Sequence, residues 1–112
     1  MKVSDLDPGS NQAFSEQYRI AAEAWVVQDA AARLLEETKT AVLSQMIARQ
    51  GDVAYNKAER LVKGSPEWSE FLTKMVDART AANTARVRLK YVEMKYFEYQ
   101  TANANKRAEM RL

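Results

Sequence analysis

The fold is decided by residues 65–99, which read SPEWSEFLTKMVDARTAANTARVRLKYVEMKYFEY. The first three residues favour the start of a helix. Ser65 is a preferred N-cap, Pro66 suits the first helical position, and Glu67 lies at the positive end of the helix dipole. Neither Gly nor Pro occurs in the rest of the chain. The stretch therefore predicts one long helix over about residues 66–107.

Within this stretch, apolar residues recur at alternating spacings of three and four. They are Phe71, Met75, Ala78, Ala82, Ala85, Leu89, Val92, Tyr96 and Tyr99. Four heptads of this kind place a continuous apolar stripe along a helix, so the pattern predicts a helix with a mating surface. A second apolar set lies on the far side of the helix from that stripe. It consists of Val76, Val87, Tyr91, Met94 and Phe97.

The upstream sequence predicts a tail and a second long helix. Asp7-Pro8-Gly9-Ser10 is a turn cluster, so we expect residues 1–9 to form a flexible tail and Ser10 or Asn11 to cap a helix over about residues 11–50. The apolar face predicted for this helix is Ile20, Ala24, Val27, Ala31, Leu35, Thr38, Val42 and Met46, widened by residues that include Ala21 and Trp25.

A short helix over about residues 53–63 is expected to connect the two long ones. Gly51 can end the first helix in the left-handed conformation, Asp52 can cap the short helix, and Gly64 can end it. The chain thus predicts an all-α fold in which residues 10–112 form a single domain, a long antiparallel helical hairpin.

An antiparallel hairpin places the start of the first helix beside the end of the last. Phe14, Tyr18 and Trp25 would then lie near Tyr91, Tyr96, Phe97 and Tyr99. Charges beside the stripe agree with this pairing. The last helix carries Lys74, Arg79, Arg86, Arg88 and Lys95, and the first offers Glu23, Asp29, Glu36 and Glu37. Such pairs specify orientation more than stability.

A lone pair of helices does not bury the second apolar set. A fully buried large side chain contributes roughly 1.5–3 kcal/mol, so exposure of five would forgo several kcal/mol. We therefore expect Val76, Val87, Tyr91, Met94 and Phe97 to form an interface in a homodimer, giving a four-helix bundle, or in a larger oligomer. The alternative is a monomer whose short helix covers one face of the pair.

Catalysis has little support in the composition. The 112 residues include no Cys and no His, which removes thiol nucleophiles, imidazole acid–base groups and Cys/His metal sites. The acidic groupings Glu36-Glu37 and Glu93/Glu98 lack the Glu-x-x-His spacing of di-iron bundles. Gly51 and Gly64 are isolated, so no phosphate-binding loop is present. We expect a protein that is not an enzyme and holds no metal or cofactor.

Nucleic-acid binding is the alternative function. The run from Arg86 to Phe97 interleaves the cations Arg86, Arg88, Lys90 and Lys95 with aromatic residues such as Tyr91. Cations bind phosphates and aromatic rings stack on bases. Against this, the net charge is only +2, and Arg86, Arg88 and Lys95 are also expected to face acids of the first helix.

Membrane association is not expected. No apolar run approaches the ~20 residues that span a bilayer, and the first seven residues do not read as a secretory signal. A cytoplasmic protein is therefore the expectation.

The C-terminal half resembles a group of small helical proteins encoded by phages and prophages. The resemblance rests on Ala54…Lys57-Ala58-Glu59, on Ser65-Pro66-Glu67-Trp68, on Ala81-Ala82…Ala85-Arg86-Val87 and on Ala104-Asn105-Lys106-Arg107-Ala108-Glu109-Met110. It covers about residues 50–112. The group is largely uncharacterised and tends to be encoded among single-strand annealing recombination genes, so the resemblance implies a setting without catalytic residues.

We therefore expect a non-enzymatic, self-associating interaction protein located in the cytoplasm of the host cell. Within the setting that the resemblance implies, it would be an accessory to phage recombination or an inhibitor that binds a host protein. Its partners would be a second copy of itself and a host or phage protein.

Overall fold

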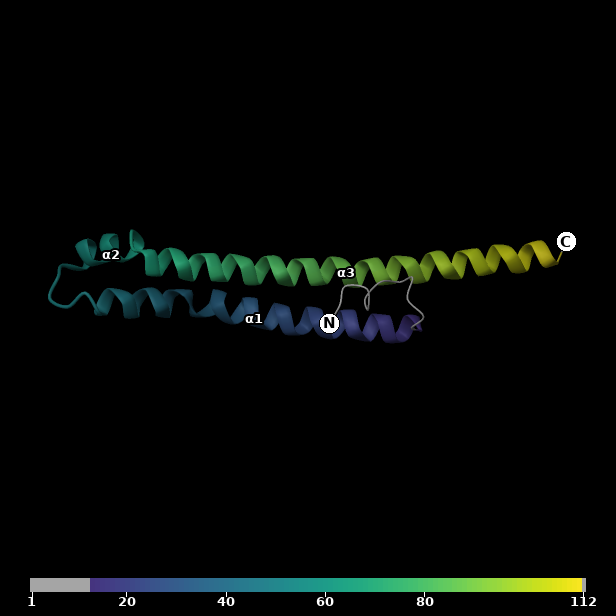
Figure 1. Ribbon diagram of the computed structural model, residues 1–112, viewed down its shortest axis with the longest axis horizontal. Coiled ribbons are helices and arrows are strands. Elements are labelled where there is room, and N and C mark those ends of the chain that lie inside the picture. The colour runs from purple at the N-terminus through teal and green to yellow at the C-terminus, as the bar shows by residue number, and fades with distance from the viewer. Residues whose placement is uncertain (1–12, 112) are drawn as a thin grey trace. The chain divides into compact units, whose positions relative to one another are not determined.

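The computed structural model describes residues 13–111. It contains three helices: α1 (Phe14–Ala48), α2 (Tyr55–Lys63) and α3 (Pro66–Met110) (Figure 1). No strand occurs within residues 13–111. The predicted all-α fold, with two long helices joined by a short one, is confirmed. The expected tail, residues 1–9, and the expected caps Ser10 and Asn11 lie outside the described residues.

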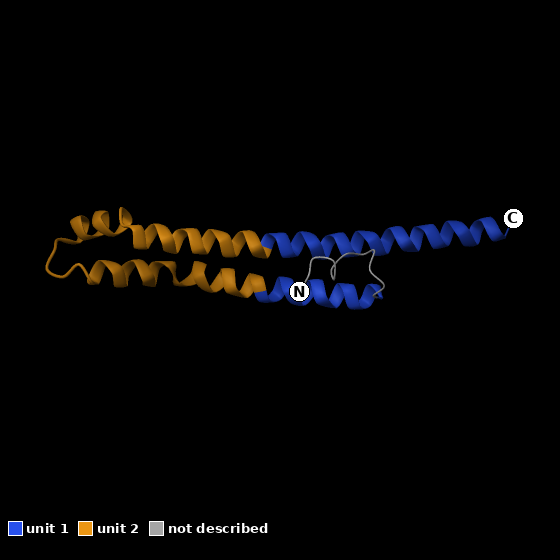
Figure 2. Ribbon diagram, in the orientation of Figure 1, with its two compact units in different colours: residues 1–27, 83–112 blue, residues 28–82 orange. Residues whose placement is uncertain are grey.

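The chain divides into two compact units (Figure 2). Unit 1 contains Met1–Val27 and Asn83–Leu112, and unit 2 contains Gln28–Ala82. In each unit a segment of α1 runs antiparallel to a segment of α3. In unit 1, Phe14 contacts Tyr99 and Ala21 packs with Leu89. In unit 2, Asp29 accepts a hydrogen bond from Arg79, and Ile47 packs with Trp68.

The connections between helices follow the sequence signals, with one exception. Gly51 has a φ of 74°, the left-handed conformation predicted for it. The Ser65 hydroxyl accepts a bond of 3.2 Å from the Trp68 N–H, which makes it the predicted N-cap of α3. The prediction for Asp52 is wrong. α2 begins at Tyr55, and its N-cap is Ala54, with no side-chain bond.

The core of unit 2 lies where α2 meets the two long helices. Ile47 of α1, Ala58 and Val62 of α2, and Trp68 of α3 are all buried against one another. The Trp68 ring stacks on Phe71 with centroids 5.5 Å apart. α2 therefore contributes one small and one branched side chain to a core whose largest member is an aromatic ring.

The core of unit 1 is narrower. Ala21 of α1 is buried against Leu89 and Val92 of α3, and Ala22 and Trp25 pack beside them. The predicted stripe of α3 is buried here at Ala85, Leu89 and Val92. Tyr96 and Tyr99 continue the stripe but are 41% and 52% exposed. They rest on Phe14, the first residue of α1, so the helix offers them no further surface.

The predicted face of α1 is wrong at Val27 and Ala31. Val27 is 67% exposed and Ala31 is also exposed, whereas Gln17, Ala21 and Ala32 are almost inaccessible. The packed stripe thus keeps the predicted Ala21 and Trp25 but continues through Ala32 in place of Ala31. Residues 20–27 are apolar at all but one position, so their pattern fits several phases. A buried glutamine at the start gave no apolar signal to choose between them.

One cation of α3 bridges two acids of α1 in unit 2. The Arg79 guanidinium donates to Asp29 Oδ1 at 2.8 Å and to both Glu36 carboxylate oxygens, at 2.8 and 2.6 Å. These bonds lower the pKa of Asp29 and of Glu36 and raise the pKa of Arg79. The predicted pairing of Arg79 with acids of the first helix is confirmed. Glu23, another predicted acid, pairs instead with Arg19 on its own helix.

The Arg79 cluster predicts an acid-dependent stability. Ordinary pKa values are 3.8 for Asp29 and 4.5 for Glu36, and both are lower in the folded chain. The stabilisation is therefore present above pH ~4.5 and is lost as pH falls through the lower folded values. We expect Arg79→Gln to lower the melting temperature by about 2–5 °C at pH 7. Below pH 4.5 the melting temperature of this variant should fall less steeply with pH than that of the wild type. Circular dichroism between pH 7 and 2.5 measures both effects, and Lys74→Gln is the control. If the melting temperature of Arg79→Gln fell with pH as steeply as that of the wild type, this role would be contradicted.

Adjacent alanines on α3 test the close packing of unit 2. Ala82 is fully buried and Ala81 is exposed. Ala82→Leu adds three carbons where no space exists, so we expect the free energy of unfolding to fall by about 1–3 kcal/mol. Ala81→Leu should change it by less than ~0.5 kcal/mol. Urea unfolding followed by circular dichroism compares the two, and equal effects would show that the helices do not approach closely at Ala82.

Candidate interaction surface

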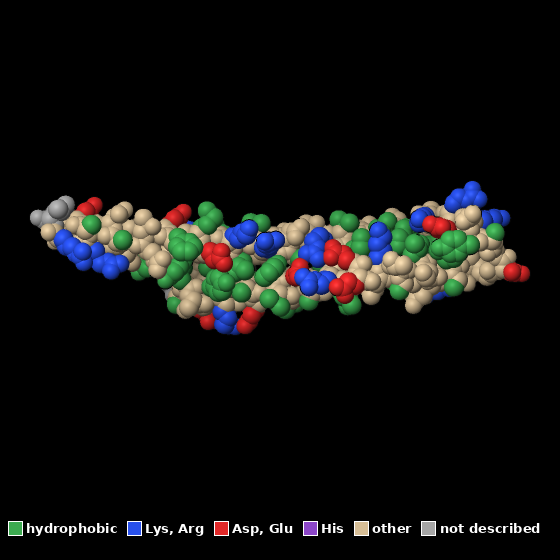
Figure 3. Space-filling view, turned by 180° about the vertical axis from the view of Figure 1, so that it is seen from behind, with side chains coloured by type: hydrophobic (Ala, Val, Ile, Leu, Met, Phe, Trp, Pro, Cys, Tyr) green, Lys and Arg blue, Asp and Glu red, His purple; other side chains and the backbone are tan. Residues whose placement is uncertain are grey.

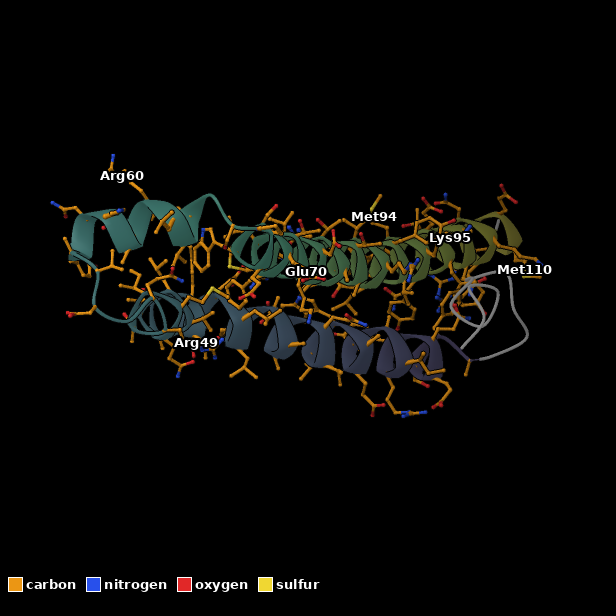
Figure 4. All side chains as sticks on the ribbon, turned by 60° about the vertical axis from the view of Figure 1, so that its left-hand side comes forward. Arg49, Arg60, Glu70, Met94, Lys95 and Met110 are labelled. Carbon is orange, nitrogen blue, oxygen red and sulfur yellow. The ribbon has the colours of Figure 1, made fainter. Side chains whose placement is uncertain are left out.

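The outer face of α3 in unit 1 carries four large hydrophobic side chains. We call Val87, Tyr91, Met94 and Phe97 the outer patch; their exposed fractions are 65%, 50%, 60% and 64%. Met94 extends from α3 on the side opposite α1 (Figure 4). All four belong to the predicted interface set. Because they recur within three turns of one helix, they form a compact apolar surface rather than scattered exposures.

Val76, the fifth member of the predicted interface, belongs to unit 2 and is 57% exposed. The alternative of a monomer whose short helix covers the apolar face is not observed. α2 packs through Ala58 and Val62 on Ile47 and Trp68. All five predicted interface residues therefore remain exposed in the single chain.

The cations beside the outer patch are more accessible than predicted. Arg86, Arg88 and Lys90 are exposed and form no ion pair within residues 13–111. The expectation that Arg86 and Arg88 face acids of the first helix is therefore wrong for the described part of the chain. Lys95 lies 3.9 Å from Glu98, its neighbour on the same helix. Three unneutralised cations thus precede the outer patch or lie within it.

Aromatic side chains gather where α1 begins, as predicted. The Phe14 ring lies 5.7 Å from Tyr96 in an edge-to-face arrangement and 5.2 Å from Tyr99. The Tyr96 ring lies 6.1 Å from Phe97, and Gln100 Nε2 donates to the Tyr96 hydroxyl oxygen at 2.8 Å. Tyr91 does not join them, because it points outward with the outer patch.

Beside these rings the structure has a cavity that the sequence did not indicate. It has a volume of about 610 Å³ and lies between the first turns of α1 and the facing turns of α3. Its lining residues are Phe14, Ser15, Tyr18, Val92, Glu93, Tyr96 and Phe97. The surrounding surface of unit 1 carries acidic and basic side chains among the hydrophobic ones (Figure 3).

The sequence marked Glu93 only as part of the acidic grouping Glu93/Glu98. Its place in this cavity could not be predicted, because it depends on the register of the two helices.

The acids show no arrangement for metal binding in the described part of the chain. No group of three or more Asp and Glu side chains converges within residues 13–111. Glu36 is bound to Arg79, and Glu98 lies near Lys95. At the start of α1, Arg19 bonds both Glu16 and Glu23, and the bond to Glu16 lowers the pKa of that carboxyl. The expectation of a protein without catalytic residues stays a prediction.

Comparisons with known proteins add no family to this description. No protein-family model, no curated protein and no solved structure matches the chain. Within residues 13–111, none of the helices has the length and apolar character that a membrane span requires.

Proposed function

We propose that this chain is a non-enzymatic interaction protein that associates with a second copy of itself through the outer patch of α3. The exposure of Val87, Tyr91, Met94 and Phe97 carries the proposal. In water, a monomer gains nothing from exposing large apolar side chains on one helix face, and their burial in a dimer would stabilise it. Packing α3 against α3 of the second copy would make a four-helix bundle.

Charge favours an antiparallel, two-fold arrangement of the two copies. The turn from Arg86 to Lys90 carries three cations and no acid, whereas residues 93–98 carry two acids and one cation. Parallel packing would place the cationic turns of both copies side by side. Antiparallel packing would place each cationic turn near Glu98 of the second copy, which is mutually attractive. An isologous interface of this kind also closes at two copies.

The resemblance of residues 50–112 to phage-encoded helical proteins supports a role for such a dimer as an accessory or host-protein-binding factor. In this proposal the outer patch assembles the protein, and other surfaces bind its protein partner.

Charged substitutions in the outer patch test self-association. Multi-angle light scattering should give twice the chain mass of 12.7 kDa for the wild type at 100 μM. In Tyr91→Glu/Met94→Glu, burial of each carboxylate in the interface is unfavourable, so we expect dimerisation to weaken by at least about 100-fold and the mass to fall to one chain. Far-UV circular dichroism should show unchanged helicity.

The matched control is Val26→Glu/Val27→Glu on α1 of the same unit. These valines are 60% and 67% exposed, so the substitutions resemble those in the outer patch in chemistry and accessibility. The control should remain a dimer. A monomeric wild type at 100 μM, or a monomeric control, would refute self-association through the outer patch.

A second candidate function is binding of single-stranded nucleic acid. It is favoured by Arg86, Arg88 and Lys90, which are exposed and without ion pairs among the described residues, and by Tyr91 beside them. Phosphates would meet the cations and a base would stack on the ring.

Salt dependence tests this second function. We expect a labelled 20-nucleotide oligothymidylate to bind in fluorescence anisotropy at 20 mM NaCl, and to bind about 100-fold more weakly at 200 mM if three phosphates are neutralised. Arg86→Gln/Arg88→Gln/Lys90→Gln should abolish binding, whereas Arg49→Gln/Lys57→Gln/Arg60→Gln in unit 2 should retain it. Absence of binding by the wild type at 20 mM NaCl would exclude the function.

A further inference from the structure

The cavity of unit 1 combines aromatic walls with a single carboxylate. Of the seven residues within 13–111 that line it, four are aromatic, Phe14 and Tyr18 from α1 and Tyr96 and Phe97 from α3. Among the described residues that line it, Glu93 supplies the only formal charge. A volume of about 610 Å³ falls within the range of small-molecule sites, roughly 300–1,000 Å³. The helices thus line a partly open space with the composition of a ligand site.

Tyr96, a central aromatic residue of the cavity wall, is restrained by several contacts. The centroid of the Tyr96 ring lies 5.7 Å from that of Phe14 and 6.1 Å from that of Phe97. The bond from Gln100 to its hydroxyl further restrains the ring. Because these contacts restrain Tyr96 before a ligand arrives, this side chain loses little conformational entropy when one binds. The face of an aromatic ring is electronegative and attracts cations.

The charge of the cavity also favours a cation. Glu93 is half-buried and forms no ion pair within residues 13–111. The positive end of the α1 dipole, at Phe14, works against a cation. The first three turns of α1 offset it, because Glu16 and Glu23 exceed the single cation Arg19. Lys90, one turn before Glu93 on α3, is exposed and forms no ion pair with this carboxylate.

We infer that this cavity binds an organic cation, a quaternary or protonated amine carried on an alkyl or aryl body. The positive group would lie over the rings of Tyr18 and Tyr96, and the Glu93 carboxylate would balance its charge. The apolar body would fill the space along Phe14 and Val92. The site needs only one chain. It is independent of the proposed self-association except at Phe97, which both surfaces share.

Amide chemical-shift titration of the full chain tests the site. The probe is benzyltrimethylammonium chloride, and we expect millimolar binding with shifts centred on Glu93 and Phe97. Choline and 3,3-dimethylbutan-1-ol, which has the same shape without the charge, isolate the contribution of charge. Choline should bind at least about tenfold more tightly. Equal affinity for the two would overturn the inference.

Substitutions locate the site. Glu93→Gln keeps the shape of the side chain and should weaken benzyltrimethylammonium binding by about tenfold, and Tyr18→Leu should weaken it by about fivefold. Lys90→Ala removes a repelling charge and should strengthen binding by about twofold. An unchanged affinity in Glu93→Gln would overturn the assignment, since this conservative variant leaves the helix intact.

Two further measurements test whether one chain is enough to make the site and whether its ligand is a free amine. Met94→Gln lies in the outer patch but not in the cavity and adds no charge beside Glu93, so it should leave cation binding unchanged even where it weakens a dimer. Loss of binding in that variant would overturn a site made by one chain. Binding of Nα-acetyl-arginine amide without binding of benzyltrimethylammonium would overturn a free amine as the ligand and assign the cavity to a side chain of a polypeptide.

Discussion

The close approach of α1 and α3 at alanines is the constraint on which the rest of the structure depends. Ala21 and Ala85 in unit 1, and Ala32 and Ala82 in unit 2, are at most 5% exposed. A larger side chain at such a buried position would require the helices to shift, so these alanines restrict the register of the two helices within each unit. Larger residues then pack at either side of the alanines, Leu89 in unit 1 and Trp68 in unit 2 among them.

Packing along one side of a helix leaves apolar side chains on its other side exposed to water. Each long helix buries one stripe against its partner, and a helix with apolar residues on two sides therefore keeps one side in water. α3 is such a helix, because Leu89 and Val92 are buried whereas Val87, Tyr91 and Met94 are exposed. The physical case for assembly comes from this asymmetry. It does not come from any residue with catalytic chemistry.

Features fixed by local chemistry could be read from the sequence. Ser65 and Pro66 start α3, and Gly51 takes the left-handed conformation, because each depends only on its own backbone and near neighbours. Asp52 has the right chemistry for a cap, but the chain continues two residues further before α2 begins. The long stripe of α3 was also predictable as far as Val92, since its spacing is unambiguous.

Features that depend on register could not be read in the same way. The apolar run of residues 20–27 fits more than one helix phase, and only the packed structure shows Gln17 inside and Val27 outside. Arg79 meets two acids, but Arg86 meets none in the described part of the chain, although both flank the same stripe. The cavity is the extreme case, because it exists only where Tyr18 of one helix lies opposite Glu93 of the other.

Phe97 connects the two surfaces that carry the proposals. Its ring is 64% exposed with the outer patch, and it also lines the cavity. A side chain has few low-energy rotamers. Phe97 must therefore use one of the same few rotamers both when it packs against a second copy and when it covers a bound cation. If one rotamer serves both, each event favours the other; if they need different rotamers, the two compete. Thermodynamic reciprocity then requires that a cation which strengthens dimerisation be bound more tightly by the dimer, by the same factor. The sign of that coupling is therefore a property of one side chain.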